Sequence, residues 1–202
     1  MLVAMPMKPF ELAKSRLAEM LADEQRERLA RALFLRTQRF FALHFADFDR
    51  LVVTQSEDVR RLSERVGSEC LLEPGVDGLN LASARAVRWA GERGYESVLL
   101  IPGDVPVWVR SEVNLLLDQA RQHGAVIAQA RDGGTNALLL RLPAAFGFCY
   151  GPDSSNTHLH AARDAGVSAV VCKLPFLALD LDVPADWAVL AANRQRALRV
   201  RS

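Results

Sequence analysis

The sequence has 202 residues, of which 50% are hydrophobic and 24% are charged, and its formal net charge is +1. This is the composition of an ordinary globular protein, so we expect a single domain over residues 1–202 and exclude a largely disordered chain. A near-zero net charge gives no overall field for a nucleic acid, and no apolar run approaches the roughly 20 residues that span a membrane.

Short apolar runs alternate with longer segments of helical periodicity along most of the chain. Several runs are nearly continuous in apolar residues, as expected for strands buried on both faces of a largely parallel sheet. The expected strands are residues 2–5, 51–54, 70–72, 97–101, 125–129, 137–142, 169–172 and 176–181. Between them, residues 22–45 have the pattern of an amphipathic helix that covers a sheet face. Shorter helices are expected to begin at Ser56, Ser111 and Ser154.

This alternation predicts a three-layer α/β fold with a mixed, mostly parallel central sheet and right-handed crossovers. Residues 125–129 and 137–142 are separated by a segment with two glycines and no helical pattern, which is hairpin spacing. We therefore expect one antiparallel element to interrupt the parallel order. In open α/β sheets, ligands bind beyond the carboxyl ends of the strands, so functional residues are expected in those loops.

The turn after the first expected strand is rich in cations. Lys8, Lys14 and Arg16 lie in one short stretch together with the Ser15 hydroxyl. Such a set suits a polyphosphate, because Arg offers a bidentate fork and Lys a mobile point charge. The turn lacks the glycines and the Gly-Lys-Ser/Thr ending of a Walker loop. The alternative is an ordinary solvated turn, since short basic clusters are common.

Two aspartates follow apolar runs far apart in the chain. Asp104 lies between Pro102 and Pro106 on a turn that suits a magnesium ligand, because Mg²⁺ takes one or two carboxylates and fills its shell with phosphate and water. Asp180 ends the last expected strand, and the two carboxylates together are expected to hold one Mg²⁺. Asp182 is instead expected to cap a following helix. The alternative for Asp104 is a turn cap.

Three further loops combine glycines with hydroxyl or amide side chains. Thr135 follows two glycines, while Gly151 and Ser154 lead into an expected helix whose free backbone N–H groups suit an anion. Gly78 permits the close approach of a base or sugar, and Asn80 offers it a hydrogen bond. Each loop taken alone also fits a simple turn with a polar cap residue.

The remaining polar residues indicate neither a metal site nor a covalent nucleophile. His158 and His160 stand two apart on an expected helix, so they face different sides and make a poor metal pair. No Gly-x-Ser-x-Gly elbow or Cys/His pairing suggests a covalent nucleophile. Three cysteines without a Cys-x-x-Cys pair disfavour a disulfide framework or a zinc ribbon and favour a cytoplasmic location.

Taken in order, these segments resemble the guanylyltransferases of deazaflavin coenzyme F-420 biosynthesis, over residues 2 to about 190. The Ala-Lys-Ser-Arg-Leu and Tyr-Gly-Pro-Asp-Ser segments are the specific ones, whereas Asp-x-Pro alone suits any sugar-nucleotide transferase. The segments that carry the resemblance are Pro6-x-Lys8, Ala13-Lys14-Ser15-Arg16-Leu17, Gly78-Leu79-Asn80, Gly103-Asp104-Val105-Pro106, Thr135-Asn136-Ala137-Leu138, Tyr150-Gly151-Pro152-Asp153-Ser154 and Leu179-Asp180-Leu181-Asp182-Val183-Pro184.

The resemblance implies a nucleotidyltransferase fold of the GT-A-like type. It also implies an enzyme that transfers GMP from GTP to a small phospho-acid and releases pyrophosphate. The acids used in the family are 2-phospho-L-lactate, phosphoenolpyruvate and 3-phospho-D-glycerate. GTP, one of these acids and magnesium are therefore the expected partners.

The same resemblance implies a role for each motif residue. Asp104 and Asp180 would hold the magnesium ion. The phospho-acid would be bound by Thr135, Gly151 and Ser154. The GTP phosphates would be held by Lys8, Lys14 and Arg16, which form the catalytic set together with Asp104. Gly78 and Asn80 would lie beside the guanine or the ribose.

Two other functions remain open at this point. A molybdopterin guanylyltransferase or a cytidylyltransferase would share the fold, but such enzymes usually carry a Gly-x-Gly-x-x-Arg turn where this chain has Pro6-Met7-Lys8-Pro9. A catalytically silent nucleotide-binding domain would bind GTP without turnover. The phenylalanine-rich residues 34–48 fit either the core or the face of a homodimer, and the core is the commoner place for such a stretch.

Overall fold

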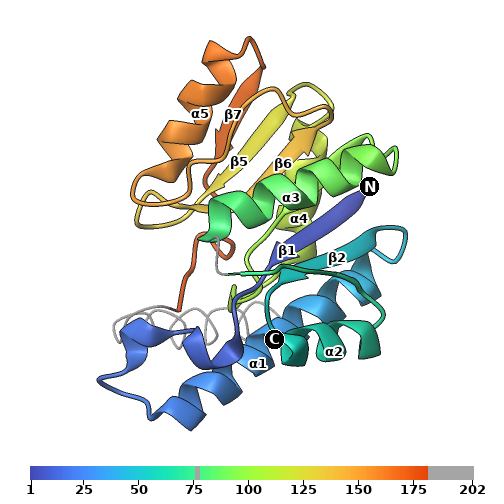
Figure 1. Cartoon of the computed structure of the whole chain (residues 1–202). Coiled ribbons are helices and arrows are strands. Elements are labelled where there is room, and N and C mark those ends of the chain that lie inside the picture. Colours follow the sequence, from blue (N-terminus) through green and yellow to red (C-terminus); the bar gives the residue numbers. More distant parts are fainter. Residues whose placement is uncertain (76–77, 182–202) are drawn as a thin grey trace, which may run out of the picture.

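The computed structural model describes residues 1–75 and 78–181, and these form a seven-stranded sheet in the order β3-β2-β1-β4-β6-β5-β7 (Figure 1). Strand β6 runs antiparallel to both of its neighbours, and the other strand pairs are parallel. The strands are β1 (Leu2–Pro6), β2 (Asp49–Thr54), β3 (Glu69–Leu72), β4 (Ser97–Leu100), β5 (Ala125–Gln129), β6 (Thr135–Arg141) and β7 (Ala169–Cys172). The expected mixed, mostly parallel sheet is confirmed.

Helices cover both faces of the sheet. One face packs against α1 (Asp23–His44), α2 (Glu57–Arg65) and α4 (Arg110–Gln119), and the other packs against α3 (Gly78–Glu92) and α5 (Ser154–Asp164). In Figure 1, α3 crosses in front of the strands, while α1 and α2 lie below β2. This arrangement is the three-layer α/β fold that the sequence predicts. The long helix expected over residues 22–45 is confirmed within one residue at each end.

Two hydrophobic clusters, one on each face of the sheet, explain the continuous apolar runs of the strands. In β1, Val3 and Met5 belong to the α1 side, whereas Leu2 and Ala4 belong to the α3 side. Because successive strand residues point to opposite faces, a strand buried on both faces must be apolar throughout. Phe34 of α1 is fully buried in the first cluster, as expected for the core.

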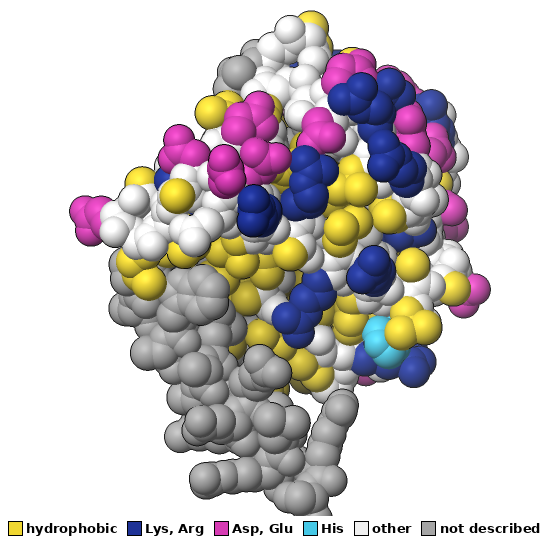
Figure 2. Space-filling model, turned by 90° about the horizontal axis from the view of Figure 1, so that it is seen from below, with side chains coloured by type: hydrophobic (Ala, Val, Ile, Leu, Met, Phe, Trp, Pro, Cys, Tyr) yellow, Lys and Arg dark blue, Asp and Glu magenta, His cyan; other side chains and the backbone are white. Residues whose placement is uncertain are grey.

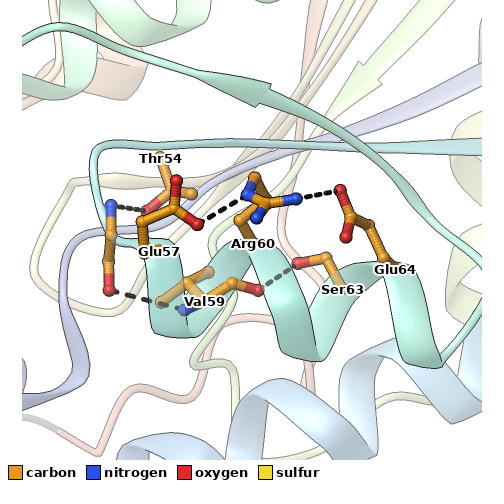
Figure 3. Close-up of polar contacts among 7 residues, drawn as sticks. Thr54, Glu57, Val59, Arg60, Ser63 and Glu64 are labelled. Atoms are coloured by element: carbon orange, nitrogen blue, oxygen red, sulfur yellow. Dashed lines mark hydrogen bonds and ion pairs between the residues drawn. The ribbon is translucent and has the colours of Figure 1, made fainter.

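Helix α2 begins where the sequence predicts, at a serine cap. The Ser56 hydroxyl accepts from the Val59 backbone N–H at 3.4 Å, and the Ser56 N–H donates to the Thr54 hydroxyl at 3.1 Å. Figure 3 shows that Arg60 lies between Glu57 and Glu64, with both ion pairs at 2.7 Å. The Ser56 hydroxyl thus satisfies one of the first amides of the helix, and the contact with Thr54 fixes the loop that leaves β2. The expected helix cap at residue 182 lies outside the described residues.

The surface carries charges of both signs. On the face seen from below in Figure 2, Lys and Arg side chains stand in small groups among hydrophobic and acidic ones. This mixture agrees with the formal net charge of +1. Across residues 1–75 and 78–181, no helix combines the length and the apolar character needed to cross a membrane.

The expected hairpin between β5 and β6 is confirmed, and it contains a bulge that matters for the site. Ala128 pairs with Ala137, but Gln129 pairs with Thr135, so Asn136 is an extra residue on β6. A one-residue insertion reverses the alternation of side chains beyond it. Thr135 consequently points to the α5 side of the sheet, the opposite of what regular alternation from Ala137 would give.

The prediction of a strand over residues 176–181 is wrong, because side chains from two other elements hold this segment in a turn. The buried Glu112 carboxylate of α4 accepts from the backbone N–H groups of Phe176 at 2.9 Å and Leu177 at 2.7 Å. The Leu177 carbonyl accepts from the Asn136 side-chain amide at 2.9 Å. Backbone groups that are satisfied in this way are not available for a strand ladder.

We predict that Glu112→Ala lowers the free energy of unfolding by about 2–3 kcal/mol, because two buried amides lose a charged acceptor. Urea denaturation monitored by circular dichroism measures this loss. Glu92→Ala, at an exposed position on α3, is the matched control and should change stability by no more than about 0.5 kcal/mol. Equal effects of the two substitutions would contradict the assigned role of Glu112.

Candidate active site

A cavity of about 400 Å³ lies beyond the carboxyl ends of four neighbouring strands, where ligands of open α/β sheets bind. Its wall is mainly apolar and carries four polar side chains: Lys8, Gln55, Glu73 and Asp104. The start of α3 closes one side, where Gly78 lies in the wall. The full lining consists of Pro6, Met7, Lys8, Val53, Gln55, Glu73, Gly78, Leu79, Ala82, Pro102, Gly103 and Asp104.

A buried lysine holds the aspartate at this cavity. The Lys14 ammonium lies 2.7 Å from the Asp104 Oδ2 atom, and the two side chains are 2% and 29% exposed. Lys14 adopts a left-handed backbone conformation with φ of 56°, which costs a non-glycine residue about 1–2 kcal/mol. The structure therefore retains local strain at the position that carries a cation to the carboxylate.

The other two expected cations lie near the same turn. Lys8 is exposed and lines the cavity directly after β1. Arg16 is exposed on the short 3₁₀ helix Ser15–Leu17 that follows Lys14. The basic turn is thus not a simple solvated loop, because its central lysine is buried against an acidic partner. Its remaining cations are accessible to an anionic ligand.

Asp180 lies at the same edge of the sheet as Asp104. Its Oδ1 atom accepts from the Asn136 side-chain amide at 2.8 Å. Leu100 of β4 pairs with Leu138 of antiparallel β6, so the carboxyl end of β4 lies beside the amino end of β6. Asp104 follows the first of these ends and Asp180 is attached to the second. The fold brings both sequence-predicted aspartates to the ends of neighbouring strands, although Asp180 follows a turn and not a strand.

These two carboxylates have the chemistry that magnesium requires. The Lys14 contact uses only the Oδ2 atom of Asp104, and oxygen donors are the preferred ligands of Mg²⁺. Within residues 1–75 and 78–181 there is no group of three or more His, Cys, Asp or Glu side chains suited to a metal ion. One or two carboxylates are a sufficient set of protein ligands for Mg²⁺ where phosphates and water complete its shell.

A second polar cluster joins β6 to α5. The Ser154 hydroxyl donates to the Thr135 hydroxyl at 3.0 Å, and the His158 Nδ1 atom lies 3.1 Å from the same Thr135 oxygen. The His158 Nε2 atom accepts from the Cys149 backbone N–H at 3.0 Å. Nε2 therefore carries no proton, and the neutral ring must donate from Nδ1 to Thr135. With both of its lone pairs occupied, the Thr135 hydroxyl can only donate to a ligand.

The loops that carry this cluster are themselves held together. The Ser155 backbone N–H donates to the Gly133 carbonyl at 3.1 Å, and the Gln129 side chain donates to the Ser155 hydroxyl at 2.7 Å. Gly151 has φ of 147° and Asp153 has φ of 53°, so the loop before α5 is tightly bent. Sequence reasoning placed Thr135, Gly151 and Ser154 at one site, and the structure joins their loops.

The two nucleotide residues expected near α3 lie in different surroundings. Gly78 lines the cavity, with φ of 78°, a conformation that favours glycine. Asn80 instead accepts from the Tyr150 backbone N–H at 2.7 Å and thereby connects α3 to the loop of Gly151. Contact of Asn80 with a nucleotide stays a prediction.

Sequence reasoning missed two side chains of this region, Glu73 and His158. Glu73 directly follows β3 and lies in the cavity wall. In the sequence, His158 is considered only together with His160, as a possible pair of metal ligands. The useful signal was its spacing from Ser154, because residues four apart share one face of a helix.

Burial lowers the pKa of His158 from 6.5 to about 4. Between these values the unfolded chain binds a proton that the folded chain does not, so stability should fall as the pH falls from about 6.5 toward 4. The full difference is about 3 kcal/mol at 1.36 kcal/mol per pKa unit.

We therefore predict that His158→Gln flattens the pH dependence of the free energy of unfolding between pH 6.5 and 4, measured by urea denaturation. His160→Gln, at an exposed position on the same helix, should leave that dependence as it is. An unchanged slope in the His158 variant would show that this ring is not held in its neutral form.

The chain is similar over most of its length to several guanylyltransferases. The sequence is 39% identical to a 3-phospho-D-glycerate guanylyltransferase of Colwellia psychrerythraea, over 94% of this chain and 90% of that relative. It is 35% identical to a 2-phospho-L-lactate guanylyltransferase of Methanothermobacter thermautotrophicus, over 90% of this chain and 79% of that relative. A phosphoenolpyruvate guanylyltransferase of Rubrobacter xylanophilus is 37% identical, over 93% and 92% of the two chains.

Solved structures share the fold at lower identity. A crystal structure from Desulfovibrio desulfuricans G20, assigned as a nucleotide-diphospho-sugar transferase, superposes with a TM-score of 0.73 at 20% identity, over 94% of this chain and 85% of the other. A nucleotidyl transferase from Methanothermobacter thermautotrophicus gives a TM-score of 0.60 at 16% identity, over 98% and 99% of the two chains. The family described as "Guanylyl transferase CofC like" matches residues 1–193. The resemblance of the motifs is thereby confirmed, and the chain belongs to the CofC-like guanylyl transferases.

Proposed function

We propose that this protein transfers GMP from GTP to the phosphate of a small phospho-acid and releases pyrophosphate. Its similarity to three guanylyltransferases, named for 3-phospho-D-glycerate, 2-phospho-L-lactate and phosphoenolpyruvate, supports this class of acceptor. In coenzyme F-420 biosynthesis, the pathway expected from the sequence motifs, the product would be an activated form of the acid.

The proposed reaction needs no nucleophilic side chain. An oxygen of the acceptor phosphate attacks the α-phosphorus of GTP, and the bond from that phosphorus to the bridging oxygen of the β-phosphate breaks. The leaving group is pyrophosphate, and the product joins GMP to the acid through a new phosphorus–oxygen bond. The acceptor phosphate is already ionised at neutral pH, so a general base is dispensable. The barrier arises mainly from bringing two anions together and orienting them.

The basic turn is suited to this electrostatic task. Lys8 lines the cavity and would contact the phosphates of GTP, with Arg16 nearby on the exposed 3₁₀ helix. Lys14 is buried against Asp104, so its charge is fixed in place before any ligand arrives. Charges that are positioned in advance need not reorganise during the reaction, which makes them more effective.

Asp104 and Asp180 would hold the expected magnesium ion. When bound, such an ion supplies positive charge that stabilises the charge developing on the phosphate oxygens. The Asn136 amide fixes Asp180, and Lys14 fixes Asp104. Each carboxylate therefore has a neighbour that helps to set its orientation.

The cluster of Thr135, Ser154 and His158 would bind the acceptor acid. Thr135 can only donate its proton to a ligand, because His158 and Ser154 already donate to its oxygen. A hydroxyl in this state suits an anionic oxygen of a phosphate or a carboxylate. Gly151, in the tightly bent loop before Ser154, leaves the backbone accessible to the same ligand.

The observation that carries the proposal is the ion pair between the buried Lys14 and the partly exposed Asp104 at the end of a nucleotide-sized cavity. Asp104 is shared by the cavity and by the basic turn, so one carboxylate connects the nucleotide pocket to the cations that would bind its phosphates.

The experiment is to measure pyrophosphate release from GTP with Mg²⁺ and each of the three acids, and to repeat it with CTP and ATP. We expect release with GTP and at least one acid, and a loss of at least a hundredfold in Asp104→Asn. Asp118→Asn, on the exposed part of α4, is the control for the loss of a carboxylate. Binding of GTP without release for any acid would identify a silent nucleotide-binding domain, and preference for CTP would identify a cytidylyltransferase.

We also predict that Thr135→Val raises the KM for the phospho-acid at least tenfold and leaves the KM for GTP within twofold. The substitution keeps the shape of the side chain but removes a charge-assisted hydrogen bond of about 1.5–3 kcal/mol. Steady-state kinetics with each substrate varied in turn measure the effect. Thr157→Val, an exposed threonine on the same helix as Ser154, should change neither KM. An equal rise in both KM values would remove Thr135 from the acid site.

A further inference from the structure

Glu73 is a nearly buried carboxylate in the wall of the cavity, opposite the end that carries Asp104. It directly follows β3, and its backbone N–H donates to the Thr54 carbonyl at 2.7 Å, which extends the pairing of β2 and β3 by one step. Its side chain is only 8% exposed, yet it lines the cavity. A buried carboxylate in an otherwise apolar wall calls for partners that donate hydrogen bonds.

One such partner comes from the protein itself. Arg85 of α3 forms an ion pair with the Glu73 Oε1 atom, and its own side chain is 20% exposed. This pair limits the rotation of the carboxylate. A carboxylate offers about four lone-pair sites on two oxygens, so the Arg85 contact leaves acceptor capacity toward the cavity.

The strand order places Glu73 far from the phosphate end. Glu73 follows β3 and Asp104 follows β4, and these strands are three positions apart in the order β3-β2-β1-β4. At about 4.8 Å per strand, the separation is about 14 Å. Residues from the ends of all four strands line the cavity between them. A nucleotide whose phosphates lie near Asp104 would therefore extend its base toward Glu73.

The chemistry of the bases decides which nucleotide fits. The guanine edge opposite the ribose presents two adjacent donors, the N1–H and the 2-amino group, which match the two oxygens of a carboxylate. Adenine and cytosine each place an unprotonated ring nitrogen at the corresponding position. The lone pair of this nitrogen would point at a carboxylate oxygen and be repelled by it. The apolar side chains of Val53, Leu79 and Ala82 line the same part of the wall and suit a flat ring.

We propose that Glu73, held by Arg85, is the residue that selects guanine. The inference rests on the proposed function, because it takes the cavity as the nucleotide site. Its chemistry predicts discrimination against two analogues. Inosine triphosphate lacks only the 2-amino group, and ATP lacks both donors. A base that loses a hydrogen bond to a buried polar group is rejected strongly, because that group is left unpaired.

The test is to measure binding of GTP, inosine triphosphate and ATP by calorimetry, with Mg²⁺ and without any phospho-acid. The wild-type protein should bind GTP at least tenfold more tightly than inosine triphosphate and at least a hundredfold more tightly than ATP. In Glu73→Gln, GTP affinity should fall at least tenfold and the GTP-to-inosine ratio should approach one. ATP should lose no affinity in this variant, because a glutamine amide can both donate to and accept from adenine.

Two further variants complete the test. Glu69→Gln, an exposed glutamate on the same strand, should keep both ratios. Glu73→Asp retains a carboxylate, so it should keep a preference for GTP over ATP even if Glu73→Gln does not fold. A wild-type GTP-to-inosine ratio below two would overturn the proposal without any variant, and so would a folded Glu73→Gln protein with unchanged ratios.

These outcomes are separable from the fate of the proposed function. Selection of GTP through Glu73 without pyrophosphate release from any acid would refute the transfer reaction and keep the guanine site. Pyrophosphate release with base preferences that ignore Glu73 would refute only the guanine site. Absence of measurable binding for all three nucleotides would overturn both.

Discussion

Strand β6 runs opposite to all of its neighbours, and the arrangement of the site depends on this reversal. In a purely parallel sheet, the loops of one edge would all follow carboxyl ends of strands. Here the amino end of β6 lies at that edge, beside the carboxyl end of β4. The hairpin loop before β6 therefore lies next to the loop of Asp104. Through Asn136, the same end of β6 also holds Asp180, which comes from a much later part of the chain.

Each important charged or polar group in this region is held by a partner from elsewhere in the sequence. Lys14 holds Asp104, Asn136 holds Asp180, and Arg85 holds Glu73. Buried or half-buried polar and charged groups are costly unless they have partners, so these contacts offset part of the cost of burying them. The pairings also fix the side chains in space before a ligand binds, and fixed charges are effective in a reaction between anions.

Much of this fold could be predicted from the sequence, because most of its strands are buried on both faces and are therefore apolar throughout. Seven expected strands exist, and the serine at position 56 caps a helix as predicted. The run at residues 176–181 looks like a strand in its apolar pattern alone. Its turn is imposed by Glu112, which lies 64 residues before Phe176 and so gives no local signal.

The residues of the candidate site also divide into those that the sequence could identify and those that it could not. Residues in continuous motifs, such as Lys14 and Thr135, could be found because their neighbours in sequence identify them. Glu73 and His158 could not, because their significance lies in burial and in partners from other elements. The orientation of Thr135 was also out of reach, since it follows from one extra residue in β6 that the sequence pattern does not reveal.

The proton arrangement around Thr135 also sets which groups its hydroxyl could bind. The imidazole of His158 and the hydroxyl of Ser154 both direct hydrogens at the threonine oxygen. A group that can only donate, such as an ammonium group, would meet another hydrogen at this point and gain no hydrogen bond. A ligand site at Thr135 would thus discriminate by the direction of the hydrogen bond. It would favour an electron-rich oxygen over a donor group of similar size.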